Sequence, residues 1–460
     1  MANLCYEDLV IGQKFEVPII NGRNVRYVNL DNAASTPPLK KVMEKINQFA
    51  EVYSSVHRGN GFKSYISTEV YQQAREIVGN FVGADLDNHS IIFVKNSTEA
   101  INKLANTFLF NDGDMIIASQ MEHHSNDLPW RKKVNIEYIN VTGSGELDMG
   151  HLIYLTEKHK GKIKLVAVTG ASNVTGYINP IHKISKIAHR VGAKLLVDAS
   201  QLAPHRRIDI SKEAGHIDFV AFTAHKLYAP FGTGVLIGPR EFFNSVEPDH
   251  VGGGTVKVVT QNSVYWDETP EKNEAGTPNV FGAVALATSI DFIQNLGFDE
   301  IKQHEHNLTR YLLKGLKNIR DIKIYGHTEA DTNIRLGVVS FNLKNISHSL
   351  VAAILSYEYG IGVRSGCFCA HPYVLKLLNI NLNEFEKYKA QIINNDKSQV
   401  PGLVRVSFGL YNTVEDVDRL IYALNNISNG KYFRDYVFDN KFGGYVPANW
   451  KYKNNCIFNL

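Results

Sequence analysis

The stretch KLLVDASQ, Lys194–Gln201, places a carboxylate directly after an apolar run, and this pattern decides the fold. Such a run predicts a strand that is buried on both faces, as in a parallel sheet. A carboxylate at the end of a buried strand is costly unless a cation or a hydrogen-bond donor meets it. Asp198 therefore either caps a buried turn or belongs to a site at the end of the strand.

A second apolar run, in IDFVAFTAHK, Ile217–Lys226, ends in a lysine. Most lysines at strand ends simply reach solvent, so Lys226 alone indicates little. However, open α/β sheets bind their ligands at the carboxyl ends of the strands. A strand-end aspartate followed by a strand-end lysine fits a pyridoxal phosphate site, which needs a lysine for the Schiff base and a carboxylate to keep the pyridine nitrogen protonated.

Similar apolar runs recur between about residue 90 and residue 240, and amphipathic segments such as PIHKISKIAHRVG separate them. These runs are IIFVK, DMIIAS, IKLVAVTG and GVLIGP. The alternation predicts an α/β fold with a largely parallel sheet. Near residue 295 the pattern changes to that of a smaller α+β domain. We expect an N-terminal segment over 1–26, a large domain over 27–294, a small domain over 295–428 and an aromatic tail over 429–460 that packs on the body or on a partner subunit.

The composition is that of an ordinary globular protein. The 460 residues are 44% hydrophobic, and 49 basic against 46 acidic residues leave a net charge of +3, so we expect neither nucleic-acid nor membrane binding. The acidic Glu7 and Asp8 do not suit a signal peptide, and we expect a cytoplasmic location. Four cysteines are too few for a disulfide scaffold, and Cys5 and Cys456 are expected to have only structural roles.

Two further segments suit a cofactor. Ser97 and Thr98, in VKNSTEAIN, stand where a strand passes into a helix, and the amides and dipole there bind an anion such as a phosphate. The alternative is a plain helix cap with Glu99 in the first turn. His123 and His124, in SQMEHHSND, follow another strand, where an imidazole can stack on a planar ring or carry a proton. A zinc site would need two or three more ligands at suitable spacing, and none is evident in the sequence.

With these residues in place, the chain resembles the class V, fold type I, pyridoxal-phosphate enzymes, and within them the cysteine desulfurases and selenocysteine lyases. The resemblance runs from about Tyr27 to about Leu424, and it implies a large domain with a mainly parallel seven-stranded sheet and a smaller α+β domain. The motifs that carry it stand in the family's order: YVNLDNAASTP, VHRG, NSTEAIN, QMEHHSN, SNVTG, VDASQ, AHKLYAPFGTG, EAGTPN and VRSGCFCA.

The resemblance implies a role for each matching residue. Lys226 would form the Schiff base, and Asp198 would pair with the pyridine nitrogen of the cofactor. The residues around the ring, the phosphate and the substrate would be Gln201, His123, Thr98, Thr223, His225 and Asn173. Arg405, in GLVRVSFGLYN, would bind the substrate carboxylate, since Arg offers a bidentate fork. Thr277, in EAGTPN, would reach the phosphate of a neighbouring subunit, which implies a homodimer with shared sites.

The segment RSGCFCAHP, Arg364–Pro372, holds two cysteines one residue apart. Half of a zinc site is one interpretation, but the chain has no second Cys pair to complete it. The family places its nucleophile at Cys369, near Arg364, where a thiolate could attack substrate sulfur. In an extended loop Cys367 and Cys369 could both face the pocket, so spacing alone does not choose between them, and the match at Ala370 and Pro372 favours Cys369. Cys367 and Phe368 stand where the family usually has a pair of histidines before the nucleophile. The GCFC sequence also resembles the corresponding segment of molybdenum-cofactor sulfurases.

The leading hypothesis is a homodimeric pyridoxal-phosphate cysteine desulfurase in sulfur metabolism and iron–sulfur cluster biogenesis. L-cysteine, or selenocysteine, would be converted to alanine, with Lys226 moving the Cα proton and His123 assisting. Cys369 would carry the persulfide and pass it to a protein acceptor. The alternatives are another class V lyase, epimerase or aminotransferase, and a scaffold without catalysis for a sulfur-transfer partner. Neither a metal nor a membrane is expected.

Overall fold

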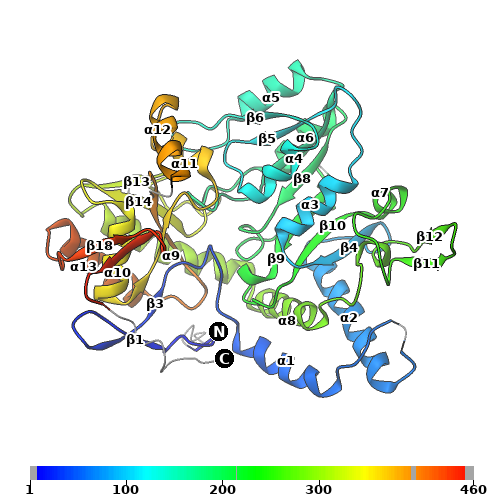
Figure 1. Cartoon of the computed structure of the whole chain (residues 1–460), viewed down its shortest axis with the longest axis horizontal. Helices are drawn as coiled ribbons and strands as arrows, with labels where there is room; N and C mark the ends of the chain where they lie inside the picture. The colour runs from blue at the N-terminus through cyan, green and yellow to red at the C-terminus, as the bar shows by residue number, and fades with distance from the viewer. Residues whose placement is uncertain (1–7, 58, 214, 395–399, 451–460) are drawn as a thin grey trace.

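Seven strands form the central sheet of the protein (Figure 1). The structure is a computed structural model, and it describes residues 8–57, 59–213, 215–394 and 400–450. The order of the strands across the sheet is β4 (His89–Val94), β10 (Gly234–Pro239), β9 (Phe219–Thr223), β8 (Lys194–Asp198), β7 (Ile163–Thr169), β5 (Met115–Ser119) and β6 (Asn135–Ile139). Among the described strands of this sheet, only β10 runs against its neighbours. The predicted α/β class with a mainly parallel sheet is confirmed.

The apolar runs are buried on both faces of the sheet. Along β8, Leu195 and Val197 point into one core cluster and Leu196 into the other, as the two-residue period of a strand requires. The helices that cover the sheet and its edges are α1 (Lys40–Val52), α2 (Phe62–Phe81), α3 (Ser97–Thr107), α4 (Leu128–Arg131), α5 (Met149–Lys158), α6 (Ile181–Arg190), α7 (Arg240–Ser245) and α8 (Val280–Leu296). The two layers of helices explain why these strands read as continuous apolar runs.

Helix α6 shows how the sequence pattern builds one of these layers. Its buried residues Ile181, Ile184 and Ala188 recur at helical spacing, and they face the core beside β8. The helix ends before Gly192, whose φ of +78° suits a residue without a side chain. The structure also has short 3₁₀ turns. Turn η1 (His124–Asn126) comes after β5, η2 (Ala224–Lys226) comes directly after β9, and η3 (Glu271–Asn273) precedes α8.

A second sheet of four antiparallel strands lies beside the first (Figure 1). Its order is β13 (Ile322–Tyr325), β14 (Val338–Leu343), β17 (Leu403–Ser407) and β16 (Arg364–Gly366). Buried side chains of α9 (Phe298–Leu316), α10 (His348–Tyr359) and α13 (Val414–Ser428) share one core with this sheet. Two further helices, α11 (His371–Leu377) and α12 (Leu382–Ile393), follow the cysteine segment.

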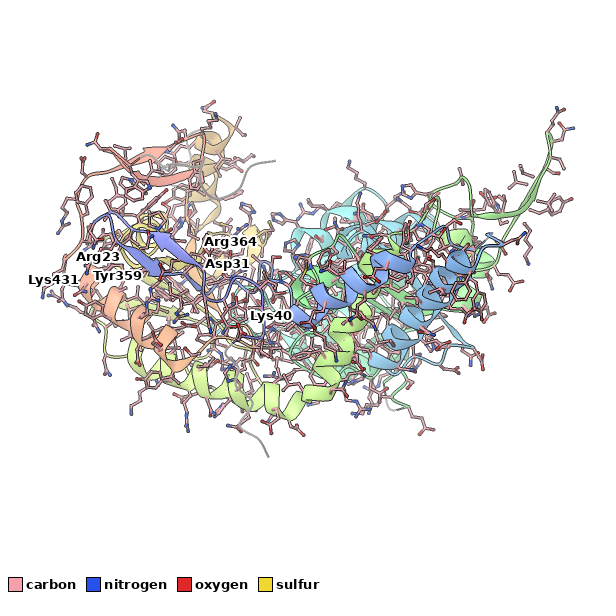
Figure 2. The ribbon with its side chains drawn as sticks, turned by 90° about the horizontal axis from the view of Figure 1, so that it is seen from below. Arg23, Asp31, Lys40, Tyr359, Arg364 and Lys431 are labelled. Atoms are coloured by element: carbon pink, nitrogen blue, oxygen red, sulfur yellow. The ribbon has the colours of Figure 1, made fainter. Side chains whose placement is uncertain are left out.

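The start of the chain also joins this second core. Val28 and Leu30 are buried in it, and β3 (Val28–Asn29) pairs in parallel with β15 (Ile361–Gly362). Figure 2 shows the blue N-terminal strands on this part of the molecule, with Asp31 and Arg364 close together. The predicted domain boundaries stay a prediction. The two-stranded ladders that complete the fold are β1 (Glu16–Pro18) with β2 (Asn24–Arg26), β11 (Val256–Val259) with β12 (Val264–Trp266), and β18 (Tyr436–Asp439) with β19 (Gly444–Pro447).

The described part of the aromatic tail packs on α10. The rings of Tyr436 and Trp450 lie 6.5 Å and 6.3 Å from that of Tyr357, centroid to centroid. Cys5 and Cys456 lie outside the described residues. Within the described ranges no single helix has the length and apolar composition to cross a membrane. The pair α8 and α9 has them only when taken together, and it bends by 80°.

Candidate active site

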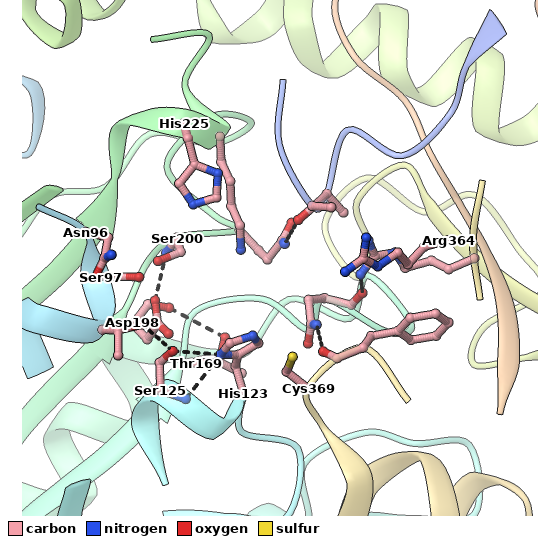
Figure 3. Close-up of a pocket in the computed structure, with 18 residues that line it drawn as sticks. Asn96, Ser97, His123, Ser125, Thr169, Asp198, Ser200, His225, Arg364 and Cys369 are labelled. Atoms are coloured by element: carbon pink, nitrogen blue, oxygen red, sulfur yellow. Dashed lines mark hydrogen bonds between the residues drawn. The ribbon is translucent and has the colours of Figure 1, made fainter. Parts of the chain in front are cut away.

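A pocket opens at the carboxyl ends of the central strands, where the second sheet meets them (Figure 3). Segments that follow β4, β5, β8 and β9 contribute to it from one side, and β16, β17 and the cysteine segment contribute from the other. The residues that line it are Ala33, Ala34, Asn96, Ser97, Thr98, His123, Ser125, Thr169, Asn173, Asp198, Ser200, Gln201, His225, Lys226, Arg364, Phe368, Cys369 and Arg405. The pocket therefore gathers most of the residues that the sequence singled out.

Lys226 and Asp198 meet in this pocket from neighbouring strands. Lys226 closes the turn η2 after β9, and Asp198 is the last residue of β8, with only 4% of its surface exposed. Burial lowers the pKa of Lys226 to about 8, although the Asp198 carboxylate acts in the opposite direction. Asp198 accepts a hydrogen bond from the backbone N–H of Ser200 at 3.0 Å. The lysine therefore loses its proton at a lower pH than an exposed lysine does.

His123 is held as a neutral imidazole. Its Nδ1 accepts the backbone N–H of Ser125 at 3.1 Å and lies 2.9 Å from the Ser125 hydroxyl. A nitrogen that accepts an N–H carries no proton, so the neutral ring has its proton on Nε2. Burial, followed by the charge of Lys226, lowers the pKa of His123 to about 4. The ring can therefore stack on a planar group or donate from Nε2.

The amino end of α3 forms one wall of the pocket. The Asn96 side chain caps the helix by accepting the Glu99 N–H at 3.0 Å, which was the alternative interpretation of this segment. Ser97 and Thr98 nevertheless line the pocket, and the Thr98 hydroxyl lies 2.7 Å from that of Ser125. The cap and the anion site coexist, because the cap uses one amide and leaves the others of the first turn.

Two buried hydroxyls at the carboxyl ends of β8 and β9 lack a partner. Within the described part of the chain, Ser200 Oγ and Thr223 Oγ1 make no hydrogen bond. Unsatisfied buried hydroxyls are costly, so they mark a place for a polar group from outside the chain. A phosphorylated ring that meets Lys226, Asp198 and the amino end of α3 fits this set of donors and acceptors. His225 lines the same pocket, and burial lowers its pKa to about 4.

Arg405 lies opposite Lys226, on β17 of the second sheet. Its Nη1 donates to the carbonyl of Asn173 at 3.0 Å, and its Nη2 donates to Asp31 Oδ1 at 2.8 Å. Its Nε is buried and has no partner among the described residues. The ring of Phe368 covers the guanidinium, 4.8 Å from its carbon. Arg405 is therefore a rigid cation with donors to spare.

Asp31 is a residue that the sequence analysis did not assign. Its carboxylate pairs with Arg405, and Arg364 approaches its other oxygen at 3.7 Å. Asp31 lies in the quoted motif YVNLDNAASTP, yet its spacing to the arginines is more than 300 positions, so no local pattern could reveal the contact. Two arginines and one carboxylate leave this side of the pocket with a net positive charge.

The two cysteines of the GCFC segment face different surroundings. Cys369 is exposed and lines the pocket, whereas Cys367 is 7% exposed and donates from Sγ to the carbonyl of Pro401 at 3.1 Å. Burial raises the pKa of Cys367 to about 12. The loop is not extended, so the two thiols do not both face the pocket. Phe368 and Cys369 both have positive φ, +53° and +55°, and this turn sends the side chains apart.

Hydrogen bonds from both sides hold this turn. Asn173 donates from Nδ2 to the carbonyl of Phe368 at 2.8 Å, and the backbone N–H of His124 donates to the carbonyl of Cys369 at 2.8 Å. Two consecutive non-glycine residues with positive φ are strained, so the surrounding contacts fix them. The structure thereby presents the Cys369 thiol to the pocket.

The remaining predicted residues divide into two groups. Gln201 lines the pocket and donates from Nε2 to the carbonyl of Ala33 at 2.7 Å. Thr277 lies elsewhere, in a second cavity lined also by Lys95 and Glu274. A single chain does not test the expected contact of Thr277 with a partner's cofactor, so that contact stays a prediction. The residues that line the pocket but have no role predicted from the sequence are Ala33, Ala34, Asn96, Ser125, Thr169, Ser200 and Phe368.

Comparisons with known proteins place this geometry in a family. The aminotransferase class-V family model matches residues 28–420. The cysteine desulfurase of Dickeya dadantii (strain 3937) is 35% identical over 419 residues, which cover 89% of this chain and 93% of that protein. The cysteine desulfurase of Haloferax volcanii is 33% identical over 407 residues, covering 86% of this chain and 88% of the relative.

Solved structures agree with the sequence comparison. The apo cysteine desulfurase from Thermococcus onnurineus NA1 matches with a TM-score of 0.78 and 34% identity, over 88% of this chain and 95% of that one. The cysteine desulfurase CsdA from Escherichia coli, an S-sulfonic acid form, matches with a TM-score of 0.75 and 28% identity, over 88% and 96%. The resemblance drawn from the sequence motifs is confirmed. This chain belongs to the aminotransferase class-V family and, within it, to the cysteine desulfurases.

Proposed function

We propose that this protein removes sulfur from L-cysteine, releases L-alanine and carries the sulfur as a persulfide on Cys369 for transfer to a protein acceptor. The observation that carries the proposal is the shared pocket of Lys226, Arg405 and the exposed Cys369. The names of the relatives support the same activity. The proposal concerns Cys369 and not Cys367, because only the former lines the pocket.

Pyridoxal 5′-phosphate is the cofactor that these residues suit. Lys226 would hold it covalently and Asp198 would face its ring nitrogen, with His123 against the ring. Its phosphate would meet the amino end of α3 at Ser97 and Thr98, and Ser200 and His225 line the same pocket. The buried Thr223 hydroxyl, at the end of β9, would be a further donor although Thr223 does not line the pocket. When bound, this cofactor supplies an electron sink for bonds broken at the amino-acid substrate.

Arg405 is proposed to bind the substrate carboxylate. Its Nε has no described partner, and Nη1 and Nη2 each donate one of their two hydrogens to Asn173 and Asp31, so three donors remain. Arg364, which is more exposed, adds a second positive charge at the mouth of the pocket. Together they would orient the amino acid with its side chain toward Cys369.

Lys226 is proposed to move the Cα proton. Burial lowers the pKa of Lys226 to about 8, so more of the side chain is a free amine, able to accept a proton, than in an exposed lysine at the same pH. The Nε2–H of His123 is a second proton donor on the same side of the pocket. Both residues line the pocket that would hold the amino acid.

Cys369 is proposed to take the sulfur as a thiolate. Its Sγ would form a bond to the substrate sulfur while the bond between Cβ and that sulfur breaks, and the electron pair of the broken bond stays with the carbon. Protonation of that carbon then gives alanine. No external oxidant enters, because the carbon gains the electrons that the sulfur loses. An acceptor thiol or a reductant must then remove the outer sulfur before a second turnover.

The test is the pair Cys369→Ser and Cys367→Ser, which are matched in chemistry and differ in place. With L-cysteine and no reductant, the wild type should form one alanine per site, and mass spectrometry should find one added sulfur on the Cys369 peptide. Cys369→Ser should form none, and Cys367→Ser should keep most of the first turnover. Sulfur on Cys367, or full activity of Cys369→Ser, would contradict the proposal.

We also propose a homodimer with shared sites. Two features support it: Thr277 lies in a cavity separate from the pocket, and the hairpin β11–β12 exposes the apolar side chains of Val258, Val259, Val264 and Tyr265. Mixing the inactive Lys226→Ala with an inactive Thr277 variant tests it. Partial recovery of activity on subunit exchange is expected, and a monomer in solution at assay concentration would overturn it.

A further inference from the structure

A cluster of metal-ligating side chains lies at the opposite end of the sheet from the pocket. Among residues 8–57, 59–213, 215–394 and 400–450, only His189, His216 and Asp218 bring three such side chains together, with ligand atoms within 4.8 Å of one another. His189 stands near the end of α6, and His216 and Asp218 precede β9. The cluster is therefore near the amino ends of β8 and β9, whereas Asp198 and Lys226 are at their carboxyl ends.

The ligand atoms of the cluster lie close together. His189 Nε2 lies 2.8 Å from Asp218 Oδ2, and His216 Nε2 lies 4.0 Å from Asp218 Oδ1. The two imidazole rings stack, with centroids 4.2 Å apart and planes at 29°. A zinc ion with ligand distances of about 2.0–2.2 Å holds its ligand atoms roughly 3.3 Å apart. The existing separations bracket that value, so small side-chain shifts would close the site.

Neighbouring hydrogen bonds fix the proton on the inner nitrogen of His189. The Ser185 hydroxyl donates its single hydrogen to the carbonyl of His216, and it lies 3.4 Å from His189 Nδ1. Nδ1 must then be the donor to Ser185. The lone pair of a neutral His189 is therefore on Nε2, facing the Asp218 carboxylate, and only a second proton or a cation between them makes that contact favourable. This is the support that bound histidines usually have.

The carboxylate is also anchored, and its surroundings are accessible. Asp218 Oδ2 accepts the backbone N–H of Leu195 at 2.8 Å, which fixes its orientation. The His216 side chain is 57% exposed, and its ring makes no hydrogen bond to a described residue. Lys194 Nζ, 3.3 Å from Asp218 Oδ1, is the competing cation.

We propose that His189, His216 and Asp218 form a binding site for a divalent transition-metal ion of the zinc type. The ion would take Nε2 of each histidine and one oxygen of Asp218, and water would complete its shell. It would displace the Lys194 ammonium, whose side chain is 41% exposed and free to turn to solvent. Bound there, the ion would tie the end of α6 to the segment that leads into β9.

The experiment is a titration of the pyridoxal-phosphate-loaded protein with Zn²⁺ against a chromophoric chelator, together with Co²⁺ absorption spectra. The wild type should bind one ion per chain at this site, with a cobalt spectrum free of sulfur-ligand bands. His216→Ala should weaken binding at least tenfold, since even the loss of outer partners of a metal site costs about 10–100-fold. This exposed substitution should leave folding and desulfuration unchanged.

Two further variants sharpen the result. Lys194→Met keeps the side-chain stem and removes the competing charge, so it should bind zinc more tightly than the wild type. His151→Ala, on α5, is the matched control and should bind as the wild type does. Equal zinc affinity of the wild type and His216→Ala would overturn the proposal. So would a cobalt spectrum dominated by sulfur ligation that His216→Ala does not alter, because the ion would then sit on the thiols.

Discussion

Replacing Arg405 by alanine tests whether this side chain binds the substrate and not the cofactor. The guanidinium has three donors free of described partners, enough for two charge-assisted hydrogen bonds to a carboxylate. Bonds of this kind contribute about 1.5–3 kcal/mol each and are not fully additive. We therefore expect Arg405→Ala to lose about 2–4 kcal/mol of transition-state stabilisation, a fall in kcat/KM of roughly 30- to 1,000-fold.

The assay is alanine formation from L-cysteine, with the visible absorption of the bound cofactor recorded beside it. The spectrum should be unchanged, since Arg405 lies across the pocket from Lys226 and bonds Asn173 and Asp31. Arg405→Lys is the matched control: it keeps the charge but loses the fork, and it should fall between the alanine variant and the wild type. Loss of the cofactor from Arg405→Ala, or an unchanged kcat/KM, would refute the assignment.

Lys226→Ala should abolish alanine formation while pyridoxal phosphate still binds through its phosphate contacts, and turnover near the wild-type rate would reject the role of the lysine. In the cofactor-free protein, recombination with pyridoxal phosphate should become faster as the pH rises through about 8, because the ammonium form of Lys226 cannot attack an aldehyde. Stopped-flow absorbance measures this rate, and a rate that does not change with pH would contradict the prediction. At pH 8 iodoacetamide should label Cys369 and spare Cys367, whose pKa of about 12 leaves roughly one thiolate in ten thousand; peptide mass spectrometry decides. Arg75→Met should destabilise the protein by about 3–5 kcal/mol in urea unfolding, because it leaves the buried Glu274, 2.8 Å away, without its cation; a loss below 1 kcal/mol would show that the pair is not needed.

The central sheet could be predicted because its strands are buried on both faces, so each strand is a local run of apolar residues. These runs do not indicate the direction of a strand, so the antiparallel orientation of β10 could not be predicted from them. Asp198 and Lys226 were found because a charge at the end of such a run stands out. Asp31 was not assigned, since its partners Arg364 and Arg405 are brought to it only by the fold.

The cysteine segment shows a different limit. Spacing suggested that Cys367 and Cys369 point the same way, which holds only if the backbone between them is extended. Phe368 and Cys369 instead have positive φ angles, a conformation that is uncommon for these residue types and that the sequence therefore does not predict. Tertiary hydrogen bonds from Asn173 and His124 select it. The burial of Cys367 is therefore a property of the folded molecule and not of the local sequence.

The pairing of β3 with β15 sets the order in which this protein can be completed during its synthesis. Val28 emerges from the ribosome early, but its partner Ile361 follows roughly 330 positions later. At ~5–20 residues per second, the wait is roughly 20–70 s. During that time Val28 and Leu30, both fully buried in the finished protein, lack part of the core that covers them. The nascent chain therefore carries an incompletely covered apolar segment that a chaperone can hold, and a chain cut short before β15 leaves β3 without the strand that it pairs with.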